Sequence, residues 1–352
     1  MAGFIYSKNS GTVNSLIGKL ETPLKMIIEH ESDACSKKNG VQKALFNVER
    51  SKKFGETIIG TSDFDVFSAV AEGAGAENDS ISETFKKFIE HIQFMKEFTI
   101  TAEMMEDANY GVSADAKRRT EQFVRAYYKT MNKLCSTALI NGTKAEATFA
   151  KAKIDLTTID GLPLFHKAHK FHTDKMTGKT QANYFNTSGF STSADGVESM
   201  LNHVTNKIRN MKDENGEIME YVADTLIIPG NCPEFESVLK KVCGTERSAG
   251  TSNNDVNIQF GNWNLVVLPD WQSADNRFMV MSSAANKDLL GNVFFNRVPL
   301  SISNWVDHHT GNYIWNGRCR FGVGFGNYKH IALVTDMTTN NSAETIAISK
   351  LS

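Results

Sequence analysis

Residues 113–142 read SADAKRRTEQFVRAYYKTMNKLCSTALING, and this stretch predicts one long amphipathic helix. Ser113 is a good N-cap, Asp115 suits the first turn, and Asn141-Gly142 is a natural end. Between these signals, apolar side chains recur at the helical period: Phe123, Val124, Tyr127, Met131, Leu134, Cys135 and Ala138. At the α-helical rise, a helix over residues 113–140 is a rod of about 42 Å, which suits the backbone of a domain or packing along a sheet.

The flanking sequence alternates helices and strands loosely, so the predicted fold class is α+β. Residues 85–101 fit both the helical and the strand period, and we assign their second half to a strand, after which Thr101 opens a helix. Residues 143–192 are expected to be irregular, and residues 312–335 to form a hairpin with two long arms. Further helices are expected at 194–212 and 233–242, and further strands at 225–228, 263–268, 277–282 and around 293–302.

Length and composition exclude several classes of protein. The chain has 352 residues, 41% of them hydrophobic, which fits two folded domains or one elaborate domain. Lys+Arg 38 against Asp+Glu 40 argues against a protein that grips nucleic acid by charge. The 5 cysteines are scattered without a CxxC pair, which disfavours a zinc ribbon or a disulfide framework. No apolar run is long enough to span a membrane, and a reducing cytosol is the default compartment.

An acidic segment stands out between Lys53 and Lys86, because it contains neither lysine nor arginine. Its centre, AEGAGAENDS (71–80), predicts a flexible turn, and the arms on either side carry large apolar residues. An acidic surface loop is the alternative, but a structureless loop of this length is uncommon in a compact domain. We therefore predict a long projecting hairpin, whose candidate subunit-interface residues are Asp63, Phe64, Asp65, Val66, Phe67 and Glu72.

The candidates for chemistry are weak. His166, His169 and His172 could bind a metal, but the HExxH pattern is missing, lysines flank them, and no acidic residue is placed to support them. We therefore expect a structural or surface role for them, and likewise for His308-His309. The glycines of GVGFGNYKH (322–330) follow a strand, so they are interpreted as sheet or turn glycines. We assign no catalytic, cofactor-binding or metal site, and the chain is not predicted to be an enzyme.

Six segments occur in an order that is similar to one known family. They are FKKFIEHIQFMKEFTITAEMMEDANYG (85–111), ALINGTK (138–144), DGLPLFHKAH (160–169), MKDENGEIMEYVADTLIIPGN (211–231), SNNDVNIQFGNWNLVVLPDW (252–271) and NYIWNGRCRFGVGFGNYKHIAL (312–333). Together they resemble the major capsid proteins of tailed bacteriophages with the Hong Kong ninety-seven type fold, especially the Mu-like major head subunit branch. Ala223 departs from this pattern, since it stands where the family usually has proline.

The resemblance implies a structural protein that self-assembles into pentamers and hexamers of an icosahedral shell, which encloses DNA without sequence-specific binding. It implies the virion as location, assembly in the bacterial host cytoplasm, no cofactor, and scaffolding, portal and decoration proteins as partners besides copies of the chain. The expected parts are an N-terminal arm (1–48), an extended loop (49–86), a peripheral domain with a long spine helix (87–190 and 303–337), an axial domain (191–302) and a C-terminal tail (338–352).

Three further interpretations remain open on the sequence. They are an encapsulin-like compartment shell, a phage tail structural protein, and a metal-dependent hydrolase that uses His166, His169 and His172. Some members of the resembled family cross-link a loop lysine to a neighbour, and since residues 54–85 contain no lysine we expect no such cross-link here. The loop begins within about 50 residues of Met1, so we also expect either a separate scaffolding protein or a chain supplied already processed.

Overall fold

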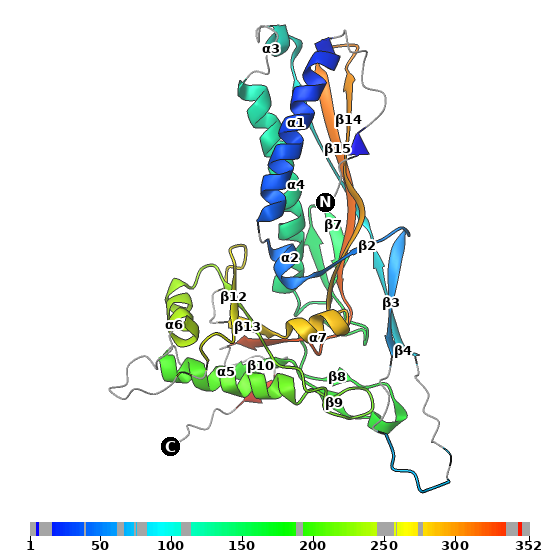
Figure 1. The fold of residues 1–352 in the computed structure, drawn as a ribbon, viewed down its shortest axis with the longest axis vertical. Coiled ribbons are helices and arrows are strands. Elements are labelled where there is room, and N and C mark those ends of the chain that lie inside the picture. Colours follow the sequence, from blue (N-terminus) through cyan, green and yellow to red (C-terminus); the bar gives the residue numbers. More distant parts are fainter. Residues whose placement is uncertain are drawn as a thin grey trace.

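The computed structural model describes residues 5–6, 16–38, 40–61, 67–73, 75, 83–106, 114–187, 193–244, 257, 259–273, 277–335 and 344–346. Within these residues the chain forms a tall, narrow half and a broader half below it (Figure 1). Each half is built on its own larger sheet, and three two-stranded sheets complete the structure.

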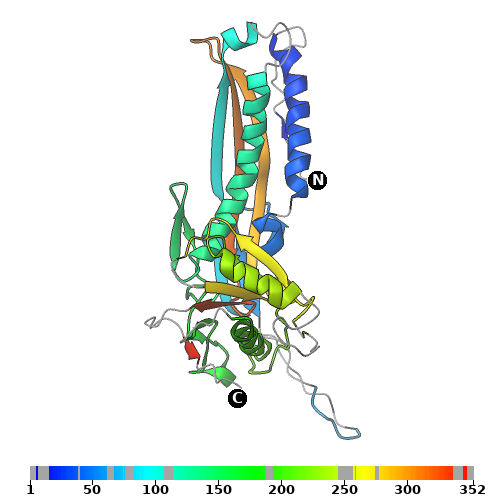
Figure 2. The ribbon, with the colours of Figure 1, turned by 90° about the vertical axis from the view of Figure 1, so that its left-hand side faces the viewer.

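The tall half contains a sheet of five strands. Its order is β1 (Ile5–Tyr6), β14 (Asn292–Val306), β15 (Tyr313–Phe325) and β5 (Ile92–Ile100), with β2 (Asn47–Arg50) also pairing with β14. Helix α4 (Ala114–Ile140) runs along this sheet with α1 (Leu16–Lys37) beside it (Figures 1 and 2). The long helix predicted over 113–140 is confirmed, and its predicted apolar stripe is buried.

Glycines in β15 let other elements approach the sheet closely. A Cβ on Gly317 would lie 2.2 Å from Cζ of Phe123, so the glycine makes room for the ring that α4 presses onto the sheet. A Cβ on Gly324 would lie 2.5 Å from Cδ1 of Ile89 in the same way. The glycines of GVGFGNYKH (322–330) were expected to be sheet or turn glycines. Gly322 and Gly324 both lie inside β15, so for these two the expectation is confirmed.

The broader half contains a sheet of six strands. Its order is β12 (Asn264–Leu268), β11 (Thr225–Pro229), β13 (Arg277–Met281), β16 (Ile331–Thr335), β10 (Tyr184–Thr187) and β17 (Glu344–Ile346). Helices α5 (Ala194–Arg209) and α6 (Pro233–Gly244) pack on one face of it. Leu226 and Ile228 enter the core under these helices, whereas Ile227 between them enters the core of the tall half. The alternation of a strand therefore joins the two halves through shared side chains.

The expected hairpin over 312–335 is wrong. Strand β15 pairs with β14 and β5, and the chain then crosses to the other sheet, where β16 pairs with β13 and β10. Strand β15 carries an alternating pattern and β16 is a short apolar run, and neither pattern identifies the pairing partner.

Several shorter elements complete the fold. Residues 83–100 form two strands, so the helical alternative for their first half is wrong. The helix expected after Thr101 is confirmed as α3, and Oγ1 of Thr101 accepts a hydrogen bond from the backbone NH of Met104 (3.3 Å). The shorter elements that complete the fold are α2 (Val41–Leu45), β3 (Gly55–Thr61), β4 (Glu83–Glu90), α3 (Ala102–Glu106), β6 (Glu146–Phe149), β7 (Ala152–Asp155), β8 (His169–Lys170), η1 (Asp174–Met176), β9 (Thr180–Gln181) and α7 (Ser283–Asp288).

Most of the remaining predicted helices and strands are also confirmed, although the region expected to be irregular contains short strands, including β10. Among the described residues, no helix is both long enough and apolar enough to cross a membrane.

Candidate functional site: the projecting hairpin and its base

A two-stranded hairpin leaves the side of the molecule where the two halves meet (Figure 1). Strands β3 and β4 pair antiparallel, with Ile58 opposite Lys87 and Ile59 opposite Lys86. Because side chains alternate along a strand, these two pairs lie on opposite faces of the hairpin. One face packs against the body of the molecule and the other faces solvent.

The inner face is fixed by a small apolar core. Ile58 and Ile89 are buried together with Val293 and Phe295 of β14, and Ile159 and Leu290 pack against this group. Phe85 of β4 is also buried, and its ring centroid lies 3.7 Å from that of the His172 imidazole. The base of the hairpin is therefore held by β14 and by the chain that follows β7, through Ile159 and His172.

A buried lysine adds an ionic anchor to the inner face. Lys87 is only 7% exposed, and its ammonium donates hydrogen bonds to the Asp155 carboxylate and to Oγ1 of Thr157. Burial alone would raise the pKa of the Asp155 carboxyl, but the hydrogen bonds from Lys87 and Thr157 outweigh burial and lower it below its usual value. Lys87 lies just beyond the lysine-free segment 54–85, and its burial was not predicted from the sequence.

A second polar anchor lies where the hairpin begins. The Ser51 hydroxyl donates to Oε1 of Glu56 (2.7 Å), so the Nε2 atom of His91, 2.8 Å from Oγ of Ser51, is the donor in that contact. Burial, followed by the nearby charge of Arg320, lowers the pKa of His91. A neutral imidazole therefore links the first residues of the hairpin to the strand that follows it.

The outer face of the hairpin presents apolar side chains to solvent. Phe54 is 61% exposed, Phe88 51% and Ile59 44%. The Phe54 and Phe88 rings are stacked with centroids 6.5 Å apart, and the guanidinium of Arg320 lies 5.2 Å from the Phe54 centroid. Aromatic residues and arginine are enriched at protein–protein interfaces, so this face has the composition of an interface.

The predicted interface residues lie beyond these strands. Phe67 is completely exposed, Val70 is 47% exposed, and Glu72 is exposed as well. Asp63, Phe64, Asp65 and Val66 lie outside the described residues. An interface role for all six candidates stays a prediction.

The histidines considered for metal binding do not converge on one point. His169 is fully buried, with Nδ1 2.8 Å from Oδ2 of Asp160 and Nε2 3.2 Å from Oδ1 of Asn183. The ring of His166 is 5.9 Å from that of His169, and its Nδ1 accepts a hydrogen bond from the backbone NH of Ala168. Among the described residues there is no group of three or more His, Cys, Asp or Glu side chains that could hold a metal ion.

The contacts of His169 correct one expectation. Sequence analysis found no acidic residue placed to support the histidines, yet Asp160 contacts His169 directly. Burial would raise the pKa of the Asp160 carboxyl, but hydrogen bonds from His169, Thr158 and the backbone of Leu162 lower it overall. The His169 ring also stacks on Tyr328, with centroids 3.7 Å apart. These contacts support the expected structural role.

Asn183 is a buried residue that sequence analysis missed. Its amide nitrogen donates to the carbonyl oxygens of Leu164 (2.7 Å), Tyr328 (3.2 Å) and Ile331 (3.2 Å). Its side chain thus satisfies the backbone where the chain crosses from β15 to β16. A single polar residue in an apolar neighbourhood, ANYF (182–185), is the only signal in the sequence.

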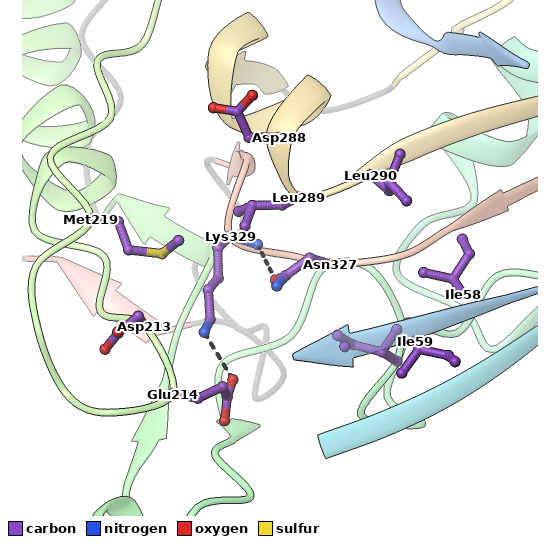
Figure 3. A pocket seen from close by; sticks show the side chains of 12 residues that line it. Ile58, Ile59, Asp213, Glu214, Met219, Asp288, Leu289, Leu290, Asn327 and Lys329 are labelled. Carbon is purple, nitrogen blue, oxygen red and sulfur yellow. Dashed lines mark hydrogen bonds and ion pairs between the residues drawn. The ribbon is translucent and has the colours of Figure 1, made fainter. Parts of the chain in front are cut away.

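A small cavity of about 140 Å³ separates the hairpin from the broader half. Figure 3 shows Ile58 and Ile59 on one side of it and Lys329 reaching toward Glu214 on the other. The Nζ atom of Lys329 lies 2.9 Å from Oε1 of Glu214, and the two side chains are 2% and 8% exposed. This volume is below that of a typical small-molecule site, so we interpret it as a packing gap beside a buried ion pair.

Comparison with solved structures shows which folds this chain resembles. The chain is similar to a structure from Mycobacterium phage Patience, with 11% sequence identity and a TM-score of 0.52. The similarity covers 97% of this chain and 95% of that chain. It also matches the capsid of Myoviridae phage XM1 at 10% identity and a TM-score of 0.49, covering 85% of this chain and 92% of that chain. The first likeness shows that the two chains share a fold. A search of the curated proteins finds no match.

The family follows from the sequence itself. The phage capsid protein family matches residues 89–334, well over half of the chain. The chain therefore belongs to the phage capsid protein family and is a structural component of the virion shell. The expected capsid fold is confirmed, whereas membership of the Mu-like branch stays a prediction.

Proposed function

We propose that this chain is a major head subunit, which assembles through pentamers and hexamers into an icosahedral shell around phage DNA. The observation that carries the proposal is the family match over 89–334, which begins inside the projecting hairpin at Ile89. The exposed apolar face of that hairpin supports assembly, because exposed aromatic rings beside an arginine are typical of surfaces that contact another protein. The described residues supply structural partners for His169, which supports a role without catalysis.

The proposed division into parts follows the family resemblance. Residues 1–48 form an arm, 49–86 an extended loop, 87–190 and 303–337 a peripheral domain, 191–302 an axial domain, and 338–352 a tail. The spine helix of this scheme corresponds to α4. Strand β14 crosses the proposed boundary at residue 302, so the two domains share one continuous strand.

The proposed partners are copies of the chain, with scaffolding, portal and decoration proteins. The net charge of -2 supports the proposal that the shell encloses DNA without binding it tightly, because each subunit contributes little net attraction to a polyanion. The absence of lysine and arginine from 54–85 supports assembly without a covalent cross-link at the loop.

Negative-stain microscopy of the purified full chain tests the proposal. Closed shells with icosahedral symmetry are expected. Tubes or stacked rings would instead indicate a phage tail structural protein, and a protein that stays monomeric at high concentration would contradict assembly altogether.

Two measurements on particles made in the host test for an encapsulin-like shell and for a metal-dependent hydrolase. The ratio of nucleic acid to protein distinguishes a DNA container from an encapsulin-like shell, which would hold cargo protein. Stoichiometric zinc or iron that is lost on His166→Ala or His172→Ala would favour the hydrolase and contradict a purely structural role. Intact-mass measurement on the same particles tests whether all 352 residues persist.

A further inference from the structure

The broader half carries a groove of about 650 Å³ beside the end of α5. Its walls come from the last turn of α5 with the residues that follow it, and from the chain around β9 (Figure 1). We call it the lysine groove, because Lys179, Lys207 and Lys212 line it. Among the described residues, no aspartate or glutamate lines it. Its volume lies in the range of ligand sites, unlike that of the cavity beside Lys329.

The two walls of the lysine groove carry positive charge without negative charge beside it in the sequence. One wall reads KMTGKTQ (175–181) and the other reads NKIRNMK (206–212). The carboxyl end of a helix attracts cations, which accounts for Lys207 and Arg209 in the last turn of α5. The Nζ atom of Lys207 also lies 5.8 Å from the centroid of the Phe185 ring in the floor of the groove.

The fold does not account for Lys179 and Lys212 in the same way. Both lie outside α5, both are exposed, and among the described residues neither has a carboxylate partner. The Nζ atom of Lys179 lies 3.6 Å from the thioether sulfur of Met176. Lys212 uses only its backbone NH, which donates to Oε1 of Gln181 (3.2 Å). Two unbalanced ammonium groups in one groove favour an anionic ligand.

The long helix α4 carries the other prominent group of cations, but carboxylates balance them. Arg118 and Arg119 contact Asp115 at 2.7 and 2.8 Å, and Arg125 contacts Glu31 at 2.6 Å. An arginine that already has a carboxylate partner attracts a further anion less strongly. The lysine groove is therefore the better candidate for an anion site.

The chemistry of the lysine groove fits phosphate oxygens better than nucleic-acid bases. Besides its ammonium groups it offers the amides of Asn206 and Asn210 and the hydroxyl of Thr180, which are side chains that contact phosphate and sugar oxygens. The two rings in its floor, Phe171 and Phe185, are 7% and 0% exposed, so neither offers a face on which a base could stack. A contact of this kind follows a nucleic-acid backbone without reading its sequence.

We infer that the lysine groove binds the phosphate backbone of the DNA that the shell encloses. The face of the broader half that carries the groove then lines the inside of the shell. A contact with about three phosphates is weak in one subunit, and its repetition over many subunits holds the outer layer of DNA near the wall. The inference rests on the proposed function and adds to it the surface that meets the DNA.

The salt dependence of DNA binding tests the inference on the unassembled full chain. The anisotropy of a short labelled duplex gives the binding constant at a series of salt concentrations. Lys179→Gln/Lys212→Gln removes two phosphate contacts, so the slope of log K against log salt should become less steep by about 1.8. Duplexes of unrelated sequence should bind equally well, because the contact is with the backbone.

Two control variants separate the groove from general charge effects. Lys117→Gln/Lys129→Gln removes the same charge from two exposed lysines of α4 and should keep the wild-type slope. Lys179→Arg/Lys212→Arg keeps both cations and should keep the slope as well. A wild-type chain that does not bind DNA, or an equal change of slope in the two glutamine variants, would overturn the inference.

An acidic protein segment and a free nucleotide are the competing ligands of the lysine groove. Polyglutamate and a nucleoside triphosphate are therefore added as competitors to the labelled duplex. The duplex is expected to bind more tightly than either, since it carries a denser row of charges than the peptide and more phosphates than the nucleotide. Polyglutamate that binds more tightly would assign the groove to an acidic protein, and a triphosphate that competes equally would assign it to a nucleotide. Either result would overturn the inference.

Photo-cross-linking in particles made in the host tests the contact inside the shell. The photoreactive residue benzoylphenylalanine replaces Lys212, and irradiated particles should give a protein–DNA product that nuclease removes. Wild-type protein that forms no particles contradicts the proposed function. Particles that enclose DNA but give cross-links only to protein contradict the lysine groove alone.

Discussion

Replacing Lys329 with methionine tests how the hairpin, the loop around Glu214 and the crossing between the sheets depend on one buried ion pair. The Lys329 ammonium lies 2.9 Å from the Glu214 carboxylate, with the two side chains 2% and 8% exposed. It also lies 5.3 Å from the centroid of the Phe171 ring. Methionine keeps the apolar stem but leaves a buried carboxylate without its cation.

The expected loss follows from the contacts that remain. Breaking a buried ion pair by removing one partner costs about 3–5 kcal/mol. Glu214 keeps a hydrogen bond from the backbone NH of His172 (3.1 Å), so we expect the lower end of that range. A loss of about 3 kcal/mol raises the equilibrium constant for unfolding by about two orders of magnitude.

A double-mutant cycle in urea measures the pair itself. Lys329→Met, Glu214→Gln and the double variant are unfolded as unassembled subunits and followed by circular dichroism. The double variant should be less destabilised than the sum of the singles by about 2 kcal/mol or more, because no unpaired charge remains. Lys153→Met is the control, since its pair with Glu146 is exposed (80% and 64%) and should cost at most about 1 kcal/mol. Additive losses, or a Lys329→Met loss no larger than the control, would refute the reasoning.

Three further predictions concern pH, packing and covalent structure. Burial lowers the pKa of His330 to about 3. Only the unfolded chain therefore gains this proton as the pH falls from about 6.5 to 3, and the free energy of unfolding should fall by up to about 1.4 kcal/mol per pH unit. His330→Gln should remove that part of the slope in urea titrations, and an unchanged slope would contradict the assignment. Gly317→Ala should destabilise the subunit by about 1–3 kcal/mol through Phe123, whereas Gly75→Ala, with nothing within 4 Å, should leave the melting temperature unchanged. Equal melting temperatures would argue against close packing at β15. Shells boiled in SDS should run as a single monomer band, and a ladder of covalent oligomers would contradict the absence of a cross-link.

The helices were predictable because their burial falls on one face. In α5 the residues Val197, Leu201, Val204 and Ile208 keep the helical period, and all of them are buried. Strand β11 was predictable for a related reason, since a short apolar run bounded by turn signals indicates a strand that is buried on both faces. These signals are local, so one sequence is enough to show them.

The pairing of strands was not predictable, because it joins residues far apart in the chain. Strands β15 and β16 follow each other closely in the chain, yet they belong to different sheets. The four apolar residues Phe85, Phe88, Ile89 and Ile92 fit a helix as well as a strand, and only the pairing of β4 with β3 decides between them.

The anchors of the hairpin were hidden for a similar reason. Lys87 stands beside Lys86 in the sequence and looks like any surface lysine, but it is buried against Asp155, which is 68 residues away. The absence of positive charge around Phe67 was visible in the sequence, because it depends on composition alone. The aromatic stack of Phe54 on Phe88 depends on the hairpin register and was therefore not visible.

The interleaving of early and late strands has a consequence for synthesis. Strand β5 needs β15, strand β10 lies between β16 and β17, and the hairpin needs Val293 and Phe295 beneath it. A nascent chain still attached to the ribosome lacks these late segments, so it has neither a finished sheet nor a supported hairpin. Subunits therefore become competent to join a growing particle only near the end of translation. We therefore expect incomplete chains on polysomes not to polymerise.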